Sequence, residues 1–536
     1  MKKDSVKKFC YALTLIFCLS IIFSGNVDAA KKKNEPEKIL YIPHDNRPIV
    51  DEQTIDVVER AGYKIVVPPK EFLGNRENLG NPDRLWVWLE ENTKKDVKAA
   101  IISSDALLYG SLVGSRKHDY EKAVILYRAE QFKEFRKKHK KLPIYVFGSI
   151  MRTPRNGAAS GYEEPDYYRH YGANIFRYTA LRDKEEMQGL TEREQKEVDF
   201  LERLIPEKAM QDWMGRRGKN FAANEVLIDM AREKTFDCLL LGRDDNAPFS
   251  QTHKESRYLT KYGESVKKNK FQTIAGIDEI GLMLLTRAIN DHTKTVPNVF
   301  VRYNYGRGEA TVPTYSDESI GETVNAEILA TGAKLVENEN RADFILAINT
   351  NSNGQTYEAN TSANDGKANN DTKFFADTVQ DYLAAGKKVV VADISFANGS
   401  DNALMEVLNQ RGLLFRLHAY SGWNTATNST GFALSTGMLA KKMSDSNKRS
   451  LLLTRYLDDW IYQANVRTIV ANQLSWIRGE GFYDALNDKR DEAADECGRM
   501  ITNFVRNNLP SAHVGENLRV DFPWNRMFES RIFFGK

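Results

Sequence analysis

The chain has 536 residues, of which 41% are hydrophobic and 28% are charged, and its formal net charge is +3. These fractions are typical of globular proteins and exclude a chain dominated by disorder. The length exceeds one ordinary domain of about 100–200 residues. The charges are spread along the chain and form no basic stripe, which argues against nucleic acid as a partner.

The N-terminus has the pattern of a signal peptide. Four lysines precede an apolar run from Phe9 to Phe23, and Val27-Asp28-Ala29 then offers small residues for cleavage. The run is shorter than the roughly 20 residues that a membrane span needs. We therefore expect residues 1–30 to be removed, and the mature protein to be secreted, extracytoplasmic and not membrane-embedded.

Short apolar runs alternate with amphipathic helical stretches along most of the chain. The runs are mostly continuous, which is typical of strands buried on both faces of a parallel sheet. The predicted strands are Ile39–Ile42, Lys64–Val67, Ala99–Ile102, Pro143–Phe147, Cys238–Leu241, Phe271–Ile274, Val299–Val301, Phe344–Ile348, Val389–Ala392 and Phe415–Leu417. The predicted helices are 51–61, 82–91, 122–138, 224–234, 278–289, 319–332, 373–386, 402–412 and 451–473.

This alternation predicts an α/β architecture, with either a parallel-stranded barrel or a doubly wound sheet at the N-terminus. The N-terminal α/β domain is expected over residues 31–296, interrupted by a helical, exposed insertion at 156–222. A second α/β region follows at 297–440, and a helical C-terminal segment at 441–536.

Polar side chains follow many of the predicted strands. In parallel α/β proteins the ligand site lies beyond the carboxyl ends of the strands, so these side chains are candidates for one shared site. The candidates for substrate binding are Asp45, Asn46, Arg47, Asp105, Arg152, Arg302, Tyr303, Trp423 and Asn424. Asp278 also follows a strand, but there the sequence favours a helix cap.

Asp244 and Asp245 are the candidate catalytic residues. Two adjacent carboxylates directly after a buried strand cost desolvation energy unless they are paired with cations, so they are kept either for such pairs or for a function. Paired carboxylates cleave glycosidic bonds by supplying an acid together with a base or nucleophile. In a substrate-assisted variant, one aspartate steers the N-acetyl group of a sugar and the other acts as the acid. Trp423, Tyr303 and Tyr420 are then expected to stack on sugar rings.

Two other functions are kept open by the same residues. One is a non-catalytic protein that binds a glycan or another small solute on this scaffold. The other is a metal-dependent hydrolase, in which Mg²⁺ or Ca²⁺ is held through oxygen by Asp45, Asp105, Asp244 and Asp393. No zinc-type spacing of His or Cys is present in the sequence, so no metal ligands and no cofactor are assigned.

Several stretches together resemble one bacterial family, catalogued as domain of unknown function four-one-two-seven. The similar stretches are 41–48, 104–110, 242–247, 278–281, 420–425 and 522–526, and the resemblance covers roughly residues 36–530. This chain departs from the family pattern at His44, where Leu is usual, at Asn46, where Asp is usual, and at Ser421, where Ala is common. The resemblance implies one functional unit and carries no established activity.

Overall fold

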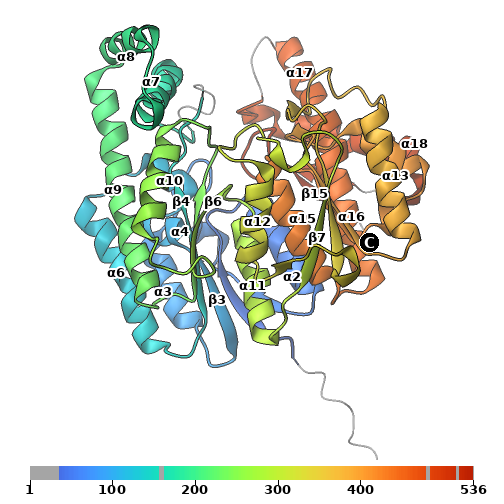
Figure 1. Cartoon of the computed structure of the whole chain (residues 1–536), viewed down its shortest axis with the longest axis horizontal. Helices are drawn as coiled ribbons and strands as arrows, with labels where there is room; N and C mark the ends of the chain where they lie inside the picture. The colour runs from blue at the N-terminus through green and yellow to red at the C-terminus, as the bar shows by residue number, and fades with distance from the viewer. Residues whose placement is uncertain (1–34, 156–161, 479–482, 513, 515–517, 535–536) are drawn as a thin grey trace, which may run out of the picture. The chain divides into compact units, whose positions relative to one another are not determined.

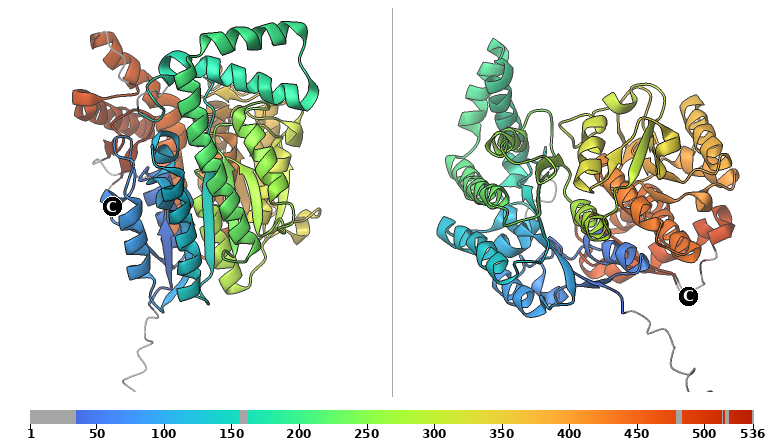
Figure 2. Two further views of the ribbon diagram at one scale, coloured as in Figure 1. Left: turned by 90° about the vertical axis from the view of Figure 1, so that its left-hand side faces the viewer. Right: turned by 60° about the horizontal axis from the view of Figure 1, so that its bottom comes forward.

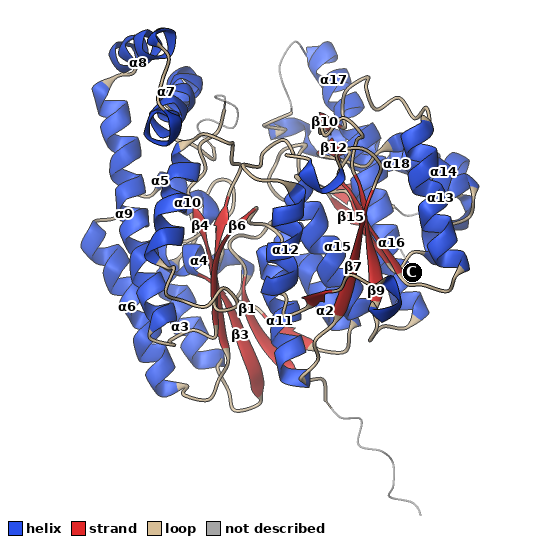
Figure 3. Cartoon of the chain, viewed as in Figure 1, coloured by secondary structure: helices blue, strands red, loops and turns tan. Residues whose placement is uncertain are grey.

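Two parallel sheets, each with helices on both faces, organise the computed structural model (Figures 1 and 3). The structure describes residues 35–155, 162–478, 483–512, 514 and 518–534. The predicted signal peptide lies outside these residues. The chain from Lys38 onwards packs as one unit, and the domain boundaries expected near residues 297 and 441 stay predictions.

The first sheet has six parallel strands in the order β2-β1-β3-β4-β5-β6. Their order reverses between β1 and β3, and the sheet stays open because β2 and β6 form its two edges. The alternative of a doubly wound sheet is therefore the one realised, and the barrel is not. The strands are β1 (Lys38–Ile42), β2 (Lys64–Val66), β3 (Val97–Ser103), β4 (Ile144–Ile150), β5 (Cys238–Arg243) and β6 (Phe271–Ala275).

Alternate residues of these strands enter two different cores, as the two-residue period of a strand requires. Leu40 and Ile42 pack on the face covered by α3, α4, α6 and α9. Ile39 and Tyr41 pack on the opposite face, against α2 and α11. Burial on both faces explains why these strands read as continuous apolar runs.

The second sheet has five parallel strands in the order β13-β11-β9-β7-β8. One face is covered by α12 and α15, and the other by α13, α14 and the C-terminal helices. Its strands are β7 (Asn298–Tyr303), β8 (Lys334–Leu335), β9 (Phe344–Asn349), β11 (Val389–Asp393) and β13 (Ala419–Ser421). Two short pairs complete the strands: β10 (Tyr357–Glu358) with β12 (Phe396–Ala397), and β14 (Arg519–Asp521) with β15 (Arg531–Phe533).

Helices α11 and α15 lie between the two sheets (Figure 1). Helix α11 covers β3 and β4 of the first sheet and packs on α15, which in turn covers β11 and β13 of the second. The helices nearest the N-terminal sheet are α2 (Thr54–Arg60), α3 (Pro82–Asn92), α4 (Ser104–Tyr109), α5 (Leu112–Lys117), α6 (Lys122–Lys138), α10 (Gln251–Tyr262) and α11 (Ile280–Thr293). Around the second sheet lie α12 (Ile320–Ala330), α13 (Asn370–Ala384), α14 (Asn402–Gln410) and α15 (Ala426–Ala440).

The predicted helical C-terminus is present, whereas the insertion with its boundaries at 156 and 222 stays a prediction. Between β4 and β5 the chain forms α7 (Tyr168–Gln188), α8 (Glu192–Leu204) and α9 (Glu207–Arg232), and α7 and α8 project beyond the carboxyl ends of the first sheet (Figure 2). Tyr168, Val198 and Trp213 give this part a small core of its own. The C-terminal helices are α16 (Asp445–Arg455), the π-helix η6 (Tyr456–Val466), α17 (Arg467–Arg478) and α18 (Arg490–Asn508); a second π-helix, η1 (Ile49–Gln53), precedes α2.

Two local predictions are wrong. The predicted strand Phe415–Leu417 is a 3-10 turn over Leu414–Arg416, and the strand begins later, at Ala419. Phe415 and Leu417 contact the core from that turn while Arg416 is exposed, so the alternation that indicated a strand belongs to a turn. Asp278 does not cap a helix, because α11 begins at Ile280 after Glu279 and no side chain caps it.

Candidate functional site

A cavity of about 360 Å³ lies at the carboxyl ends of the first sheet. It is placed where the strand order reverses, which is where open α/β sheets bind their ligands. Loops of the second sheet and of the C-terminal segment close its other sides. The residues that line it include Asp45, Arg47, Arg116, Arg152, Arg155, Glu163, Asp244, Asp245, Asp278, Tyr315, Asn398, Asn424, Tyr483, Trp524, Arg526 and Phe528. We call this cavity the first cleft.

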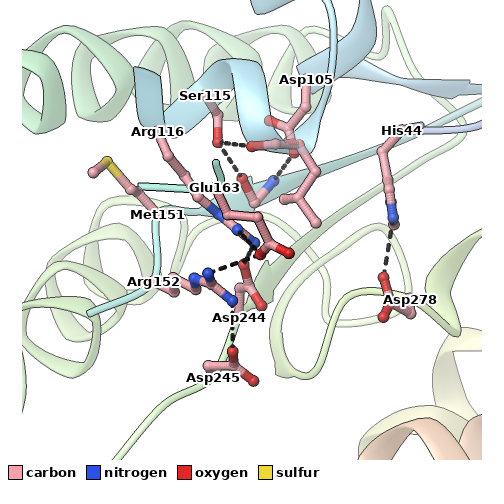
Figure 4. A network of polar contacts seen from close by, with 12 residues as sticks. His44, Asp105, Ser115, Arg116, Met151, Arg152, Glu163, Asp244, Asp245 and Asp278 are labelled. Atoms are coloured by element: carbon pink, nitrogen blue, oxygen red, sulfur yellow. Dashed lines mark hydrogen bonds and ion pairs between the residues drawn. The ribbon is translucent and has the colours of Figure 1, made fainter. Parts of the chain in front are cut away.

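Asp45, Arg47 and Asp278 form one buried charge cluster in the first cleft. The two-residue spacing lets Asp45 accept from the backbone N–H of Arg47 at 3.0 Å and from its Nε at 3.0 and 3.1 Å. The two terminal nitrogens of Arg47 donate to Asp278 at 2.6 and 3.1 Å. His44 Nε2 lies 3.0 Å from the same carboxylate, and the two side chains face each other in Figure 4. Arg47, in the stretch that follows β1, thus fixes the carboxylate of Asp278, which comes 231 residues later.

A second cluster surrounds the tandem aspartates (Figure 4). Arg116 of α5 donates to Asp244 at 2.6 Å, and Arg152, just after β4, donates to Asp245 at 2.9 Å. Both guanidinium groups also donate to Glu163 Oε2, each at 2.9 Å. The two aspartates are therefore held by different arginines that share one glutamate.

The C-terminal segment closes this cluster from the far end of the chain. Arg526 forms an ion pair with Glu163 and contacts Glu529 through two nitrogens. Trp524 Nε1 donates to the Asn46 side chain at 2.8 Å. Residues from the two ends of the described sequence are therefore both needed to build the first cleft.

The carboxylates of the first cleft meet different electrostatic environments. Burial and the neighbouring charge of Asp244 raise the pKa of Asp245 to about 6. Burial acts in the same direction on Asp278, but Arg47 and His44 outweigh it and hold the pKa of that carboxyl well below its usual range. Burial of Glu163 is likewise outweighed by Arg526, Arg152 and Arg116, and its pKa is low. One cleft thus holds a carboxyl suited to carry a proton near neutral pH beside carboxylates that stay ionised.

Unusual backbone conformations gather at this cavity. Among the described residues eight positions other than glycine have a positive φ, and four of them line the first cleft. These are Asp245 (φ 37°), Tyr315 (69°), Asn398 (63°) and Asn424 (60°). Such conformations cost about 1–3 kcal/mol each and tend to be kept where side chains are aimed at a ligand.

The structure brings six of the predicted site residues together. Asp45, Arg47, Arg152, Asp244, Asp245 and Asn424 all line the first cleft, although their chemical roles stay predictions. The other five do not line it. Asn46 contacts Trp524, and Asp105 lies beneath the cleft, where it accepts from the Ser149 backbone at 3.0 Å.

The remaining three of those five lie elsewhere. Trp423 is only 2% exposed and packs in the core between the two sheets, so its ring is not available for stacking there. Arg302 is exposed on β7, and Tyr303 packs beside the core of the second sheet. Both lie within β7, an inner strand of the second sheet, and neither lines the first cleft.

Several residues of the first cleft were not predicted. Asp278 follows a strand, and the strand-end rule alone would have included it. Arg526 belongs to a stretch that carries the family resemblance, but no strand-end rule points to it. Arg116 and Glu163 carry no local signal, because they belong to a helix and a loop far from the aspartates in sequence.

In the described part of the chain, no group of three or more His, Cys, Asp or Glu residues is arranged to hold a metal ion. No helix within that part of the chain is long and apolar enough to cross a membrane.

The fold and the first cleft define an α/β protein with two open parallel sheets and a composite polar site. Comparison with known families gives one match, to a family described as protein of unknown function (DUF4127), over residues 39–532. The chain belongs to this family. Neither the curated proteins nor the solved structures yielded a match.

Proposed function

We propose that the protein is a hydrolase that cleaves a glycosidic bond in the first cleft. The observation that carries this proposal is the pair of unlike carboxylates. Asp245 receives one arginine hydrogen bond beside a second aspartate, whereas Asp278 is bound by Arg47 through two nitrogens and by His44. Two carboxyl groups with opposite tendencies to hold a proton are what glycosidases use as acid and as anion.

The charge balance of the first cleft favours a neutral substrate. Of the five arginines that line the first cleft, Arg155 is exposed, and each of Arg47, Arg116, Arg152 and Arg526 is paired with at least two carboxylates of the protein. The paired guanidinium groups are therefore already neutralised and are poorly suited to hold a phosphate or sulfate. Carboxylates, amides and the rings of Tyr315 and Phe528 instead suit a polyhydroxyl compound such as a glycan.

In this proposal Asp245 donates its proton to the oxygen of the leaving sugar. Asp244, fixed by Arg116, orients an N-acetyl group, whose carbonyl oxygen attacks the anomeric carbon as the glycosidic bond breaks. Asp278 stays ionised and stabilises the positive charge that develops on the sugar. Water then opens the cyclic intermediate and returns the proton to Asp245.

The test is release of reducing ends by residues 31–536 from chitin oligosaccharides and cell-wall glycan fragments, with cello-oligosaccharides as substrates lacking N-acetyl groups. Loss of the acid in Asp245→Asn should lower turnover at least about 100-fold while oligosaccharide binding is kept. Asp381→Asn, which changes an exposed aspartate on α13, is the matched control. Binding by the wild type without any turnover would identify a binding protein, and activity lost with a chelator would favour the metal-dependent alternative.

We further propose that the protein acts outside the cytoplasm after removal of residues 1–30. The lysine-rich start and the short apolar run support this proposal. Expression of the whole chain in a bacterial host, followed by N-terminal sequencing of the exported protein, should give Lys31 as the first residue. A chain that keeps Met1 and stays inside the cell would contradict it.

A further inference from the structure

The second sheet repeats the strand order of the first. The order β8-β7-β9-β11-β13 follows the same scheme as β2-β1-β3-β4-β5, and it reverses between β7 and β9. The physical rule that places the first cleft therefore predicts a ligand site at the carboxyl ends of β7 and β9 as well.

A cavity of about 140 Å³ occupies that point, and we call it the second cleft. It is lined by Asn304, directly after β7, by Asn349 and Thr350 at the end of β9, and by Ser395 after β11. None of these residues lines the first cleft. The strand ends of the second sheet thus surround a separate polar space.

The walls of the second cleft are held rigidly. The Asn349 side chain donates to Asp393 at 3.0 Å and to Asp401 at 3.2 Å. Asp401 accepts from the first backbone N–H groups of α14 at 3.0 and 3.3 Å, and so its charge is offset by that helix. These contacts fix the polar groups before any ligand binds.

Two polar groups in the second cleft are left for a ligand. Thr350 is 1% exposed, and its hydroxyl has no hydrogen-bond partner among the described residues. A buried hydroxyl without a partner costs about 1–3 kcal/mol, so an occupant that satisfies it is favoured. Asp371, in the first turn of α13, lines the same space, and its carboxylate is not paired within the described part of the chain.

The chemistry of the second cleft favours a neutral polyhydroxyl ligand. Among the described residues, Lys367 is the only cation that lines it, whereas Asp365, Asp371 and Asp401 all do, so the excess of carboxylates disfavours an anion. Amides, hydroxyls and carboxylates offer both donors and acceptors, and the rings of Tyr357 and Phe396 border the space. A sugar ring can direct its hydroxyls to these polar groups and its C–H face to the aromatic rings.

We propose that the second cleft binds one neutral sugar unit. This inference does not depend on the chemistry of the first cleft. The two-stranded sheet of β10 and β12 separates the sites: Tyr357 and Phe396 line the second cleft, whereas Glu358 accepts from Tyr315 and Asn398 of the first. A polymeric glycan that occupies the second cleft is therefore held close to the first.

The test is saturation-transfer NMR on residues 31–536 carrying Asp245→Asn, with glucose, galactose and N-acetylglucosamine as probes and inorganic phosphate as the anionic probe. We expect at least one sugar to bind. Ala363→Trp places a ring at the mouth of the second cleft, and Asp371→Ala removes the carboxylate; each should weaken binding at least about tenfold, which is 1.4 kcal/mol. The matched control, Asp381→Asn, changes an exposed aspartate on the same helix as Asp371 and should leave this affinity unchanged.

Three results would overturn the inference: no sugar binds, phosphate alone binds, or sugar affinity is unchanged in both Ala363→Trp and Asp371→Ala. Thermal melting of each variant checks that it is folded. If Ala363→Trp fails to fold, Asp371→Ala decides the question. Since no turnover is measured, failure of this test is separate from failure of the proposed hydrolase activity.

Discussion

At the scale of single residues, the cation that each carboxylate meets decides what it can do. Asp278 is bound by Arg47 through two hydrogen bonds, at 2.6 and 3.1 Å, and stays ionised. Asp245 accepts from Arg152 and has Asp244 beside it, and burial together with the charge of Asp244 raises its pKa to about 6. Two aspartates in one cavity thereby differ in their tendency to hold a proton without a difference in residue type.

Asp278→Asn should lower the free energy of unfolding by about 2–4 kcal/mol at pH 7, because it removes one partner of a buried ion pair. The pKa of Asp278 is lower in the folded than in the unfolded state, so its contribution is present above about pH 4 and is lost as the pH falls further. The gap between wild type and variant in urea unfolding should therefore narrow between pH 5 and pH 3. Asp381→Asn is the control, and an equal effect of both changes would refute the assignment.

Single residues show which parts of the site can be predicted from the sequence and which cannot. Asp45, Arg152 and Asp244 were predictable because each follows a strand, and parallel strands end at the same edge. Trp423 also follows a strand, yet it turns into the core between the sheets. Sequence position places a residue at an edge, but the direction of its side chain depends on packing with elements that come much later.

At the scale of elements, glycines on α15 allow close contact with both neighbours. A Cβ atom at Gly437 would lie 2.5 Å from Val390 Cγ2 of β11, and one at Gly431 would lie 2.5 Å from Glu279 Cγ. Helix α15 therefore approaches the second sheet on one side and the start of α11 on the other. This contact sets the spacing of the two sheets and places Asn424 at the first cleft.

Gly437→Ala should destabilise the protein by about 1–3 kcal/mol, because the added methyl group overpacks the contact with β11. The matched change, Gly215→Ala on α9, meets no atom within 4 Å and should stabilise the protein by about 0.5–1 kcal/mol through helix propensity. Denaturant unfolding of the two variants compares them directly. If Gly437→Ala stabilised the protein as Gly215→Ala does, the close contact between α15 and β11 would be refuted.

Element positions were largely predictable from the sequence. The helix Lys122–Lys138 was predicted to the residue, and the apolar run from Cys238 marks β5. The prediction failed at Phe415–Leu417 because the apolar-polar-apolar order of these residues suits a short strand and is here part of a buried turn. Local periodicity does not report which strands are neighbours. The sequence alone therefore does not decide whether the first sheet closes into a barrel.

At the scale of the whole molecule, the first cleft needs residues from nearly the full described length of the chain. Arg526 reaches Glu163, which is 363 residues earlier, and Glu163 in turn contacts Arg116 and Arg152. These contacts join the C-terminal segment to the start of the helical insertion. No local pattern in the sequence encodes such pairs, which is why Arg526 and Glu163 were not predicted.

Arg526→Met should lower the free energy of unfolding by about 3 kcal/mol and reduce turnover, because it leaves Glu529 buried without its cation and loosens Glu163. Arg519→Met, at an exposed arginine of β14 in the same segment, is the control and should change stability by less than about 0.5 kcal/mol. Thermal unfolding and reducing-end assays measure the two effects. Unchanged stability of the Arg526 variant would show that the C-terminal segment is not needed to build the first cleft.

The most direct test of the central claim is the pH dependence of kcat/KM on a soluble glycan. Asp245 must carry a proton to act as the acid, so kcat/KM should fall as the pH rises through about 6, in line with its raised pKa. The Asp245→Asn variant should retain little activity and lose this falling limb. A wild-type profile that is flat between pH 5 and pH 8, or a variant with the same limb, would contradict the account.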